Sequence, residues 1–363
     1  MGFLAALLFH AALAQAAAVR VAPPVPAAPL VPPALGPGIA LSQSLSSPLP
    51  RLEERVVRAW TETLASIPAA RAETAFLESH RVTFKIAPLG DEFGEAGNIA
   101  LFEADPSGSG GTLLVNETML DKALRGLQRQ GASVEDAPVL FARLTAGIVA
   151  HELRHGITKT GIREKTGFPF PVNFLDNEVF SYMVQAMVSI QTRELFPSLR
   201  SYSIYSVGQI EQTVLDAWAK GPQGLEEYVQ DRYSGILSLR DSGEDALLAR
   251  LQEAGEQIEE RLLQVDAAKK RLESADSDEM RDYARTELSL ATRDLGEQEL
   301  RDALAKIEAA RKAIGTPGFL GTLRALLEGE RAGLDRQEDA PEWRQWRESR
   351  LREIQERPVP TFD

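Results

Sequence analysis

The stretch FARLTAGIVAHELRH, residues 141–155, contains the most informative motif of this 363-residue chain. Within it, His151, Glu152 and His155 form an H-E-x-x-H pattern. Histidines four residues apart lie on the same face of a helix, so both imidazoles can bind one metal ion. The intervening glutamate can act as general base on a water that the metal activates. The pattern therefore predicts a zinc site with two histidine ligands and a catalytic glutamate.

The residues before this motif indicate that both histidines face inward. The helix-spaced series at intervals of 3, 4, 3 and 4 consists of Phe141, Leu144, Ile148, His151 and His155. A helix does not bury two imidazoles without partners, because unpaired polar groups in the interior are destabilising. A pair of core histidines bonded to carbonyls or carboxylates is the alternative, but the interposed glutamate favours a metal site.

Catalytic zinc needs a third protein ligand and one open position. The chain has no cysteine, and the histidine outside the leader and the motif is His80, which lies upstream beside a predicted strand. Glu178, at the start of a predicted helix over residues 176–195, is the candidate. A carboxylate that caps this helix without any metal is the alternative, because acidic residues favour a first helical turn.

The helix over residues 176–195 also carries a polar stripe on an otherwise apolar surface. The stripe consists of Glu178, Ser181, Tyr182, Gln185 and Ser189. Such a stripe is expected to face a wet cleft.

These two segments resemble the gluzincin metallopeptidases, the thermolysin-like class. Residues 151–155 match their first motif, and Asn177-Glu178-x-x-Ser181 is similar to their N-E-x-x-S-D ligand motif. The resemblance implies that His151, His155 and Glu178 bind Zn²⁺ and that Glu152 is the base. It also implies a small sheet whose edge strand, here residues 112–116, holds the substrate polypeptide as an extended strand.

The chain departs from that family where Tyr182 replaces the aspartate that orients a ligating histidine. Asp176 and Asn177 are both candidates for that role, and the sequence does not choose between them.

No histidine follows residue 155, so the family's oxyanion-stabilising histidine has no counterpart here. Tyr182, Tyr202 and Tyr205 are candidate donors. Tyr182 is the predicted catalytic donor, because it shares a helix face with Glu178.

The composition excludes several other classes of protein. With 44% hydrophobic residues the chain can bury a core, and its net charge of −13 disfavours nucleic acid and anionic membranes as partners. The absence of cysteine excludes disulfides, thiolate zinc sites and cysteine nucleophiles.

The N-terminal composition predicts export. Residues 3–14 form an apolar stretch too short to span a bilayer comfortably, and small residues follow it, as in a signal peptide over residues 1–18, with an uncleaved membrane anchor as the alternative. Residues 19–50 are rich in proline and alanine, which predicts a linker, with a pro-segment as the alternative. We therefore expect a periplasmic or secreted protein with no stable membrane insertion after cleavage.

The rest of the chain predicts an α+β fold. A helix over residues 51–67 precedes three short strands, at 81–87, 98–103 and 112–116, which are expected to form a small antiparallel sheet. This sheet should pack on the two zinc-binding helices, the first running from Asp136 through at least His155. Residues 51–240 are thus predicted to be a zincin-like metallopeptidase domain.

Residues 241–363 are predicted to be helical. Leu251, Ile258, Val265 and Leu272 recur every seven residues, which predicts one arm of a coiled-coil-like hairpin. A turn at 274–278 would lead into a returning helix, and the pair could bind a protein partner or self-associate. The function predicted overall is an exported zinc metalloendopeptidase. The alternative is a helical interaction protein with a structural or vestigial zinc site.

Overall fold

The computed structural model describes residues 39–41, 49–87, 99–105, 110–233, 235–292 and 296–356. The predicted signal peptide and most of the 19–50 segment lie outside these residues. None of the described helices has the length and apolar character that crossing a membrane requires.

The described residues form two compact units. The first unit contains residues 39–161, 175–232 and 325–356, and the second contains 162–174 and 233–324. The division predicted at residue 240 differs from this, because residues 325–356 pack with the unit that contains the H-E-x-x-H helix.

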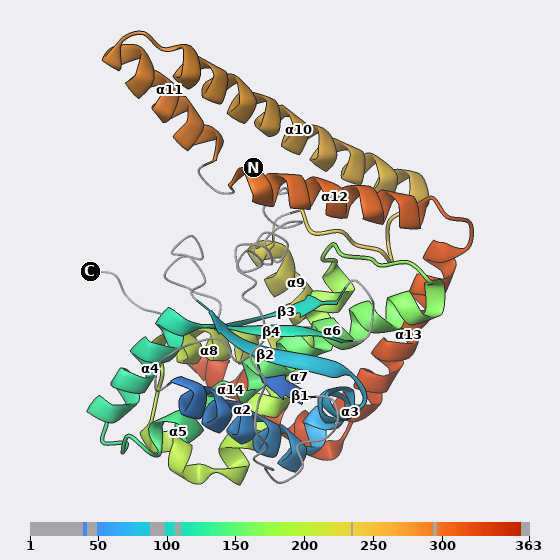
Figure 1. Cartoon of the computed structure of the whole chain (residues 1–363). Helices are drawn as coiled ribbons and strands as arrows, with labels where there is room; N and C mark the ends of the chain where they lie inside the picture. Colours follow the sequence, from blue (N-terminus) through green and yellow to red (C-terminus); the bar gives the residue numbers. More distant parts are fainter. Residues whose placement is uncertain are drawn as a thin grey trace, which may run out of the picture. The chain divides into compact units, whose positions relative to one another are not determined.

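The sheet of the first unit has four strands in the order β1-β2-β4-β3 (Figure 1). Their bounds are Ile39–Leu41 for β1, Arg81–Ala87 for β2, Ala100–Ala104 for β3 and Gly110–Asn116 for β4. The coarse α+β prediction is confirmed. The prediction of an antiparallel sheet is wrong, because β4 runs parallel to β2 while β3 runs antiparallel to β4.

The prediction that residues 112–116 form an edge strand is also wrong. β4 lies between β2 and β3, and its residues are nearly all buried. In the antiparallel β3–β4 pair it is β4 that also pairs with β2, so β3 lies at an edge of the described sheet. The uninterrupted apolar run Leu113–Val115 is typical of such an interior strand.

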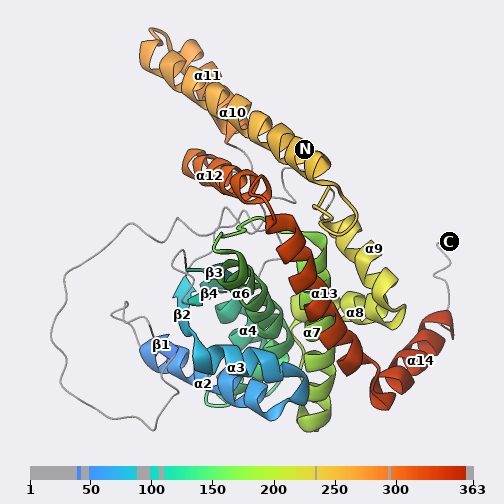
Figure 2. The same ribbon diagram turned by 90° about the vertical axis from the view of Figure 1, so that its right-hand side faces the viewer.

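The helices of the first unit pack mainly on one side of the sheet and against one another (Figures 1 and 2). The helices that precede the H-E-x-x-H motif are α2 (Leu49–Ser66), α3 (Arg71–Ser79), α4 (Glu117–Arg129) and α5 (Ala137–Leu144). Those that carry or follow it are α6 (Ala146–Thr166), α7 (Leu175–Leu195), α8 (Tyr205–Ala219), α9 (Pro222–Arg232), α13 (Phe319–Glu338) and α14 (Pro341–Glu356). The predicted helices at 51–67 and 176–195 are confirmed.

The long helix predicted from Asp136 is interrupted at Thr145, which separates α5 from α6. The Thr145 hydroxyl donates to the carbonyl of Phe141 and accepts from the indole N–H of Trp60, at 2.7 and 2.9 Å. Bonding of a threonine hydroxyl to the carbonyl four residues earlier bends helices. The interruption shifts the buried face, so that Ile148 is only half-buried.

The second unit contains the helices predicted for the hairpin. α10 (Glu244–Ser274) packs against α11 (Asp278–Ala291) and α12 (Glu297–Ile314), as Figures 1 and 2 show. Leu251, Ile258 and Val265 are fully buried as predicted, whereas Leu272 is half-buried. The returning arm consists of two helices, because a new helix starts where the Gly296 N–H bonds to the Glu299 carboxylate.

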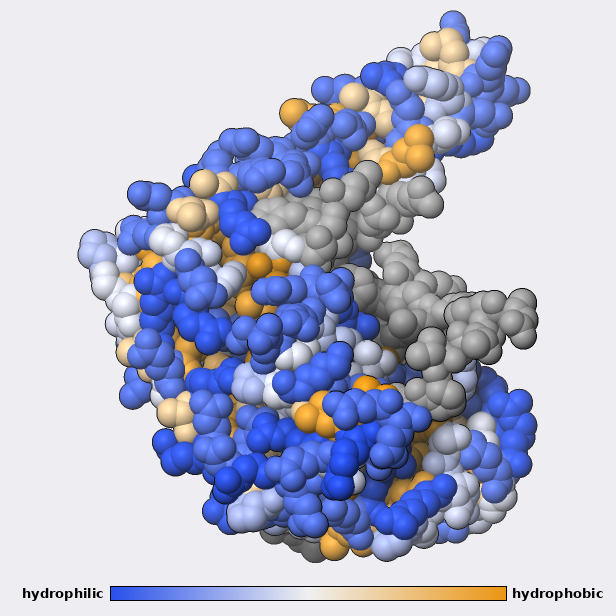
Figure 3. All heavy atoms as spheres, turned by 180° about the vertical axis from the view of Figure 1, so that it is seen from behind, coloured by the Kyte–Doolittle hydropathy of each residue, from blue (hydrophilic) through white to orange (hydrophobic). Residues whose placement is uncertain are grey.

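The surface is largely polar, in keeping with the 26% of charged residues. The face in Figure 3 is mostly hydrophilic, with small separate apolar areas.

Candidate metal centre

Three side chains from two helices meet in the first unit. His151 and His155 on α6 and Glu178 in the first turn of α7 offer ligand atoms that all lie within 4.8 Å of one another. The two imidazole Nε2 atoms are 3.0 Å apart, and they lie 3.7 and 3.6 Å from the Glu178 carboxylate oxygens. All three residues are at least 95% buried. The structure thus brings together the three predicted ligands, and the group could hold a metal ion.

Two glycines allow α6 to lie this close to its neighbours. A Cβ at Gly147 would be 2.2 Å from the Ser189 hydroxyl and 2.9 Å from the Gln185 carbonyl oxygen, both on α7. A Cβ at Gly156 would be 2.7 Å from the ring of Phe102 on β3. One glycine therefore sets the distance between the ligand-bearing helices, and the other sets the distance from α6 to the sheet.

The protonation states and hydrogen bonds suit a cation. Neither carboxylate oxygen of Glu178 accepts a hydrogen bond from the described residues. Burial raises the pKa of Glu178 to about 8, despite the opposing charges of Lys159 and Arg232. Burial, aided by the Arg232 charge, lowers the pKa of His151 to about 3. His151 is therefore neutral, as a metal ligand must be, and a bound cation would neutralise the buried carboxylate.

Ser181 supports one of the histidines. Its hydroxyl lies 3.3 Å from Nδ1 of His155, one turn after Glu178 on α7. A partner on Nδ1 directs Nε2 towards the other two ligand atoms. The sequence analysis named Asp176 and Asn177 as candidates for this role, and the structure places the Ser181 hydroxyl against this imidazole nitrogen. Ser181, which orients the His155 imidazole, thus belongs to the Asn177-Glu178-x-x-Ser181 motif that the sequence analysis recognised.

The polar stripe of α7 is buried rather than exposed to a wet cleft. Glu178, Ser181, Tyr182 and Gln185 are all less than 5% exposed. They face α6, where the Ser181 hydroxyl lies 3.3 Å from Nδ1 of His155 and Gln185 acts electrostatically on His151. The expectation of a wet cleft is therefore wrong, because these polar side chains are buried.

Glu152 connects the metal centre to the sheet. Its Oε2 accepts the backbone N–H of Phe102 on β3 at 3.0 Å. Burial raises the pKa of Glu152 to about 8, although the Phe102 hydrogen bond opposes this shift. Lys159, one turn after His155, is within electrostatic range of Glu152, and the sequence analysis did not single it out. Glu152 can therefore gain and lose a proton near neutral pH.

Aromatic side chains border the other side of the site. The ring of Tyr182 lies 4.4 Å from that of His151 and 5.1 Å from that of Tyr228 on α9. The Tyr228 phenol hydrogen-bonds both Tyr182 and Arg232. Tyr205, another candidate donor, is 79% exposed on α8.

The remaining candidate donor, Tyr202, follows the short helix Pro197–Ser201 and is half-buried. The sequence analysis missed Tyr228 and Arg232, because α9 lies outside both motifs.

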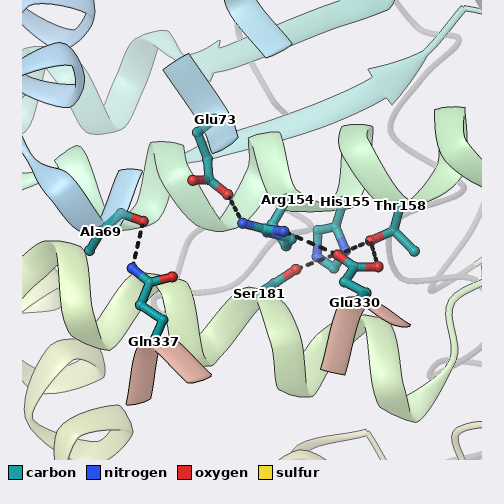
Figure 4. Close-up of polar contacts among 8 residues, drawn as sticks. All are labelled: Ala69, Glu73, Arg154, His155, Thr158, Ser181, Glu330 and Gln337. Atoms are coloured by element: carbon teal, nitrogen blue, oxygen red, sulfur yellow. Dashed lines mark hydrogen bonds and ion pairs between the residues drawn. The ribbon is translucent and has the colours of Figure 1, made fainter. Parts of the chain in front are cut away.

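An ionic network beside the histidines anchors α6 (Figure 4). Arg154 pairs with Glu73 of α3 at 2.5 Å and with Glu330 of α13 at 3.2 Å. The Thr158 hydroxyl donates to the same Glu330 carboxylate at 2.9 Å. Arg154 and Thr158 lie next to His155 around the helix, so this network borders the face of α6 that carries the two histidines. The contacts of Arg154 and Thr158 with Glu330 therefore help to fix the orientation of that face.

No protein-family model, curated protein or solved structure matches this chain.

Proposed function

We propose that this protein is a zinc metallopeptidase of the gluzincin type. The observation that carries the proposal is the convergence of His151, His155 and Glu178 beside Glu152, which itself binds an edge strand. Two imidazoles and one carboxylate are the ligand set of thermolysin-like catalytic zinc, which leaves the fourth position open.

The ligand spacing supports zinc. With bonds of about 2.0–2.1 Å, tetrahedral geometry places the ligand atoms ~3.3 Å apart. The three separations of 3.0, 3.6 and 3.7 Å lie on both sides of that value. Shifts of a few tenths of an ångström would bring the atoms to this spacing.

The chemistry expected of the site follows from its residues. A bound zinc ion supplies a Lewis acid that acidifies water and polarises a carbonyl group. Glu152 accepts the proton of the attacking water and delivers it to the leaving amine. Its pKa of about 8 suits this exchange, because the carboxyl group can occupy both protonation states near neutral pH. Ser181 keeps the His155 imidazole oriented meanwhile.

The substrate is proposed to bind as an extended strand against β3. Asn116 N–H bonds to the Ile99 carbonyl, and Asp105 N–H bonds to the Gly110 carbonyl. Since antiparallel bonding alternates along a strand, the backbone groups of Phe102 point away from β4. The Phe102 N–H donates to Glu152, so Glu152 lies at the free edge of β3. A substrate strand paired with that edge would therefore lie directly beside the proposed base. β3 thus takes the role that the sequence analysis gave to residues 112–116.

Zinc stoichiometry and turnover test the proposal together. Purified residues 19–363 should retain about one zinc ion per chain after mild chelation and zinc return, as measured by elemental analysis. His151→Ala should lose the metal. Glu152→Gln should keep it and lose cleavage of a fluorescent casein. A Glu152→Gln protein that cleaves at the wild-type rate would refute the assignment of the base, and a protein without tight zinc would refute the site.

A second candidate function is a helical interaction protein with a closed, structural zinc site. The observation that favours it is the unit of α10, α11 and α12, which the proposed chemistry does not need. A hydroxamate should displace solvent from an open catalytic site and should not bind a closed one. Export of the chain, proposed from its first 18 residues, is tested by N-terminal sequencing of the protein recovered outside the cell.

A further inference from the structure

One side of α11, in the second unit, carries an exposed row of large side chains. The row consists of Met280, Tyr283, Glu287 and Leu290, and its three uncharged members are each more than half exposed. The intervals of 3, 4 and 3 residues are those of the a and d positions of a coiled-coil heptad, so the four side chains lie along one side of the helix. This row is termed the α11 seam.

A different row of α11 joins the helix to its own unit. Ala284 and Ala291 are buried, and α11 packs along α10 (Figures 1 and 2). Each alanine comes one residue after a member of the α11 seam, which places it about 100° further around the helix. α11 therefore has two contact faces, of which one is used within the chain and the other is exposed.

The α11 seam is held in place before any contact is made with it. The Ser277 hydroxyl accepts the N–H of Met280 at 3.2 Å and caps the start of α11. Arg271 of α10 forms an ion pair with Glu287, in the middle of the seam. Because the helix is already ordered, a binding partner does not have to supply the free energy of folding it.

The order of residues in the α11 seam is self-complementary. Its members are placed symmetrically about residue 285, with 280 and 290 at the outside and 283 and 287 at the inside. If the helices of two copies pair antiparallel about that point, Met280 of one copy faces Leu290 of the other, and Tyr283 faces Glu287. The outer layers are then apolar, and in the inner layers a phenol can donate a hydrogen bond to a carboxylate.

A parallel pairing lacks this complementarity. Each residue would then face the same residue of the other copy, so two Glu287 carboxylates would meet inside the interface. Like charges placed directly opposite each other are destabilising, whereas the antiparallel pairing gives each of these carboxylates a donor. The sequence of the seam therefore favours a second copy in the antiparallel orientation.

We propose that α11 is a dimerisation helix, through which two copies of this chain associate by antiparallel pairing of their α11 seams about residue 285. A two-fold interface uses the same patch on both copies, as a self-complementary row requires. The inference concerns the second unit and does not depend on the proposed peptidase function. One helix of 14 residues buries less than the roughly 800 Å² per partner of a standard interface, so the expected dissociation constant is on the order of 10–100 µM.

Sedimentation equilibrium of the full chain tests the association. Between about 1 and 300 µM, the weight-average mass should rise from that of one chain towards that of two. Tyr283→Glu sets a second carboxylate against Glu287 and should raise the dissociation constant at least about tenfold, whereas Tyr283→Lys forms an ion pair there and should keep it within about threefold. Leu263→Glu, which adds the same charge at an exposed position of α10, is the matched control and should leave it unchanged.

Cross-linking tests the orientation, because the chain has no cysteine of its own. A variant with both Met280→Cys and Leu290→Cys should form a covalent dimer under mild oxidation, since these positions face each other across the antiparallel pair. Either substitution alone should leave the chain largely monomeric, because the two copies of one position lie ten residues apart along the helix axis, about 15 Å.

The outcomes are distinct. A mass of one chain up to about 300 µM would overturn the proposal, and so would association that Leu263→Glu removes and Tyr283→Glu leaves intact. Covalent dimers formed as readily by the single variants as by the double variant would overturn the antiparallel pairing. A structural defect from replacing the tyrosine would affect Tyr283→Lys as well as Tyr283→Glu, so the difference between these two variants separates recognition from misfolding.

Discussion

Replacing Gly147 with alanine should damage the metal site even though alanine favours helix. The added Cβ would lie 2.9 Å from the Gln185 carbonyl oxygen, whereas ordinary contact starts at 3.4 Å. The difference between these distances is about 0.5 Å, so α6 and α7 must move apart by about this much to relieve the clash. The Ser189 hydroxyl, at 2.2 Å, can rotate away, but the carbonyl belongs to the α7 backbone and cannot.

The expected magnitudes follow from two opposing terms. Alanine in a helix interior gains about 1 kcal/mol over glycine, whereas overpacking costs about 1–3 kcal/mol. The metal-free protein should therefore lose up to about 2 kcal/mol of unfolding free energy. Zinc affinity should fall by at least about tenfold, because a shift of ~0.5 Å exceeds the ~0.2 Å that ligand distances tolerate.

Gly161 provides a matched control on the same helix. A Cβ there would meet only the Leu326 side chain, at an ordinary 3.6 Å. Gly161→Ala should therefore leave zinc binding unchanged and raise stability by about 0.5–1 kcal/mol. Urea unfolding followed by far-UV circular dichroism gives the stabilities, and competition with a chromophoric chelator gives the affinities. A Gly147→Ala protein as stable as Gly161→Ala, with unchanged zinc affinity, would refute the reasoning.

Three further perturbations have definite expected outcomes. Arg154→Met leaves the buried Glu73 carboxylate and the partly buried Glu330 carboxylate without their cation, and should lower the unfolding free energy in urea by about 3–5 kcal/mol. Arg125→Met breaks an ion pair in which both partners are more than half exposed, and should change the unfolding free energy by less than about 1 kcal/mol. Ile258→Ala in α10 should cost about 2–5 kcal/mol without loss of zinc, and Leu263→Ala, 68% exposed on the same helix, should cost almost nothing in the same unfolding assay. The pKa of Glu178 is about 8 in the folded state against 4.5 for a free carboxyl, so the metal-free folded state binds a proton that the unfolded state has lost. The urea concentration at the unfolding midpoint should therefore decrease as the pH is raised from about 6.5 to 8. Glu178→Gln should make this decrease smaller, and an unchanged slope would contradict the reasoning.

The sequence was most informative where helical periodicity and side-chain chemistry coincide. His151 and His155 had to share a face at any backbone geometry close to a helix, and Glu178 opened the next helix with a strong apolar pattern. The same local patterns predicted the bounds of β2 and α7 closely. These features depend on residues within a few positions of one another, which is the range over which periodicity carries information.

The features that the sequence did not predict depend on distant pairings. Whether β4 lies at the edge or in the interior is decided by its pairing with β2, which no local pattern encodes, although its apolar run was compatible with an interior position. The position of Tyr228 beside Tyr182 depends on how α9 packs on α7. The interruption at Thr145 depends on the indole of Trp60, 85 residues earlier in the chain.

The Arg154 network has a consequence for the order in which the protein matures. Glu330 follows Arg154 by 176 residues, yet its carboxylate completes the ionic and hydrogen-bond partners of Arg154 and Thr158 on α6. During synthesis the two histidines leave the ribosome long before that carboxylate does, and until then Glu73 is the remaining ionic partner of Arg154 among the described residues. A nascent chain that ends before residue 330 therefore holds α6 less firmly, so that tight binding of the proposed metal ion is expected to be a late step, after nearly the whole polypeptide has been made.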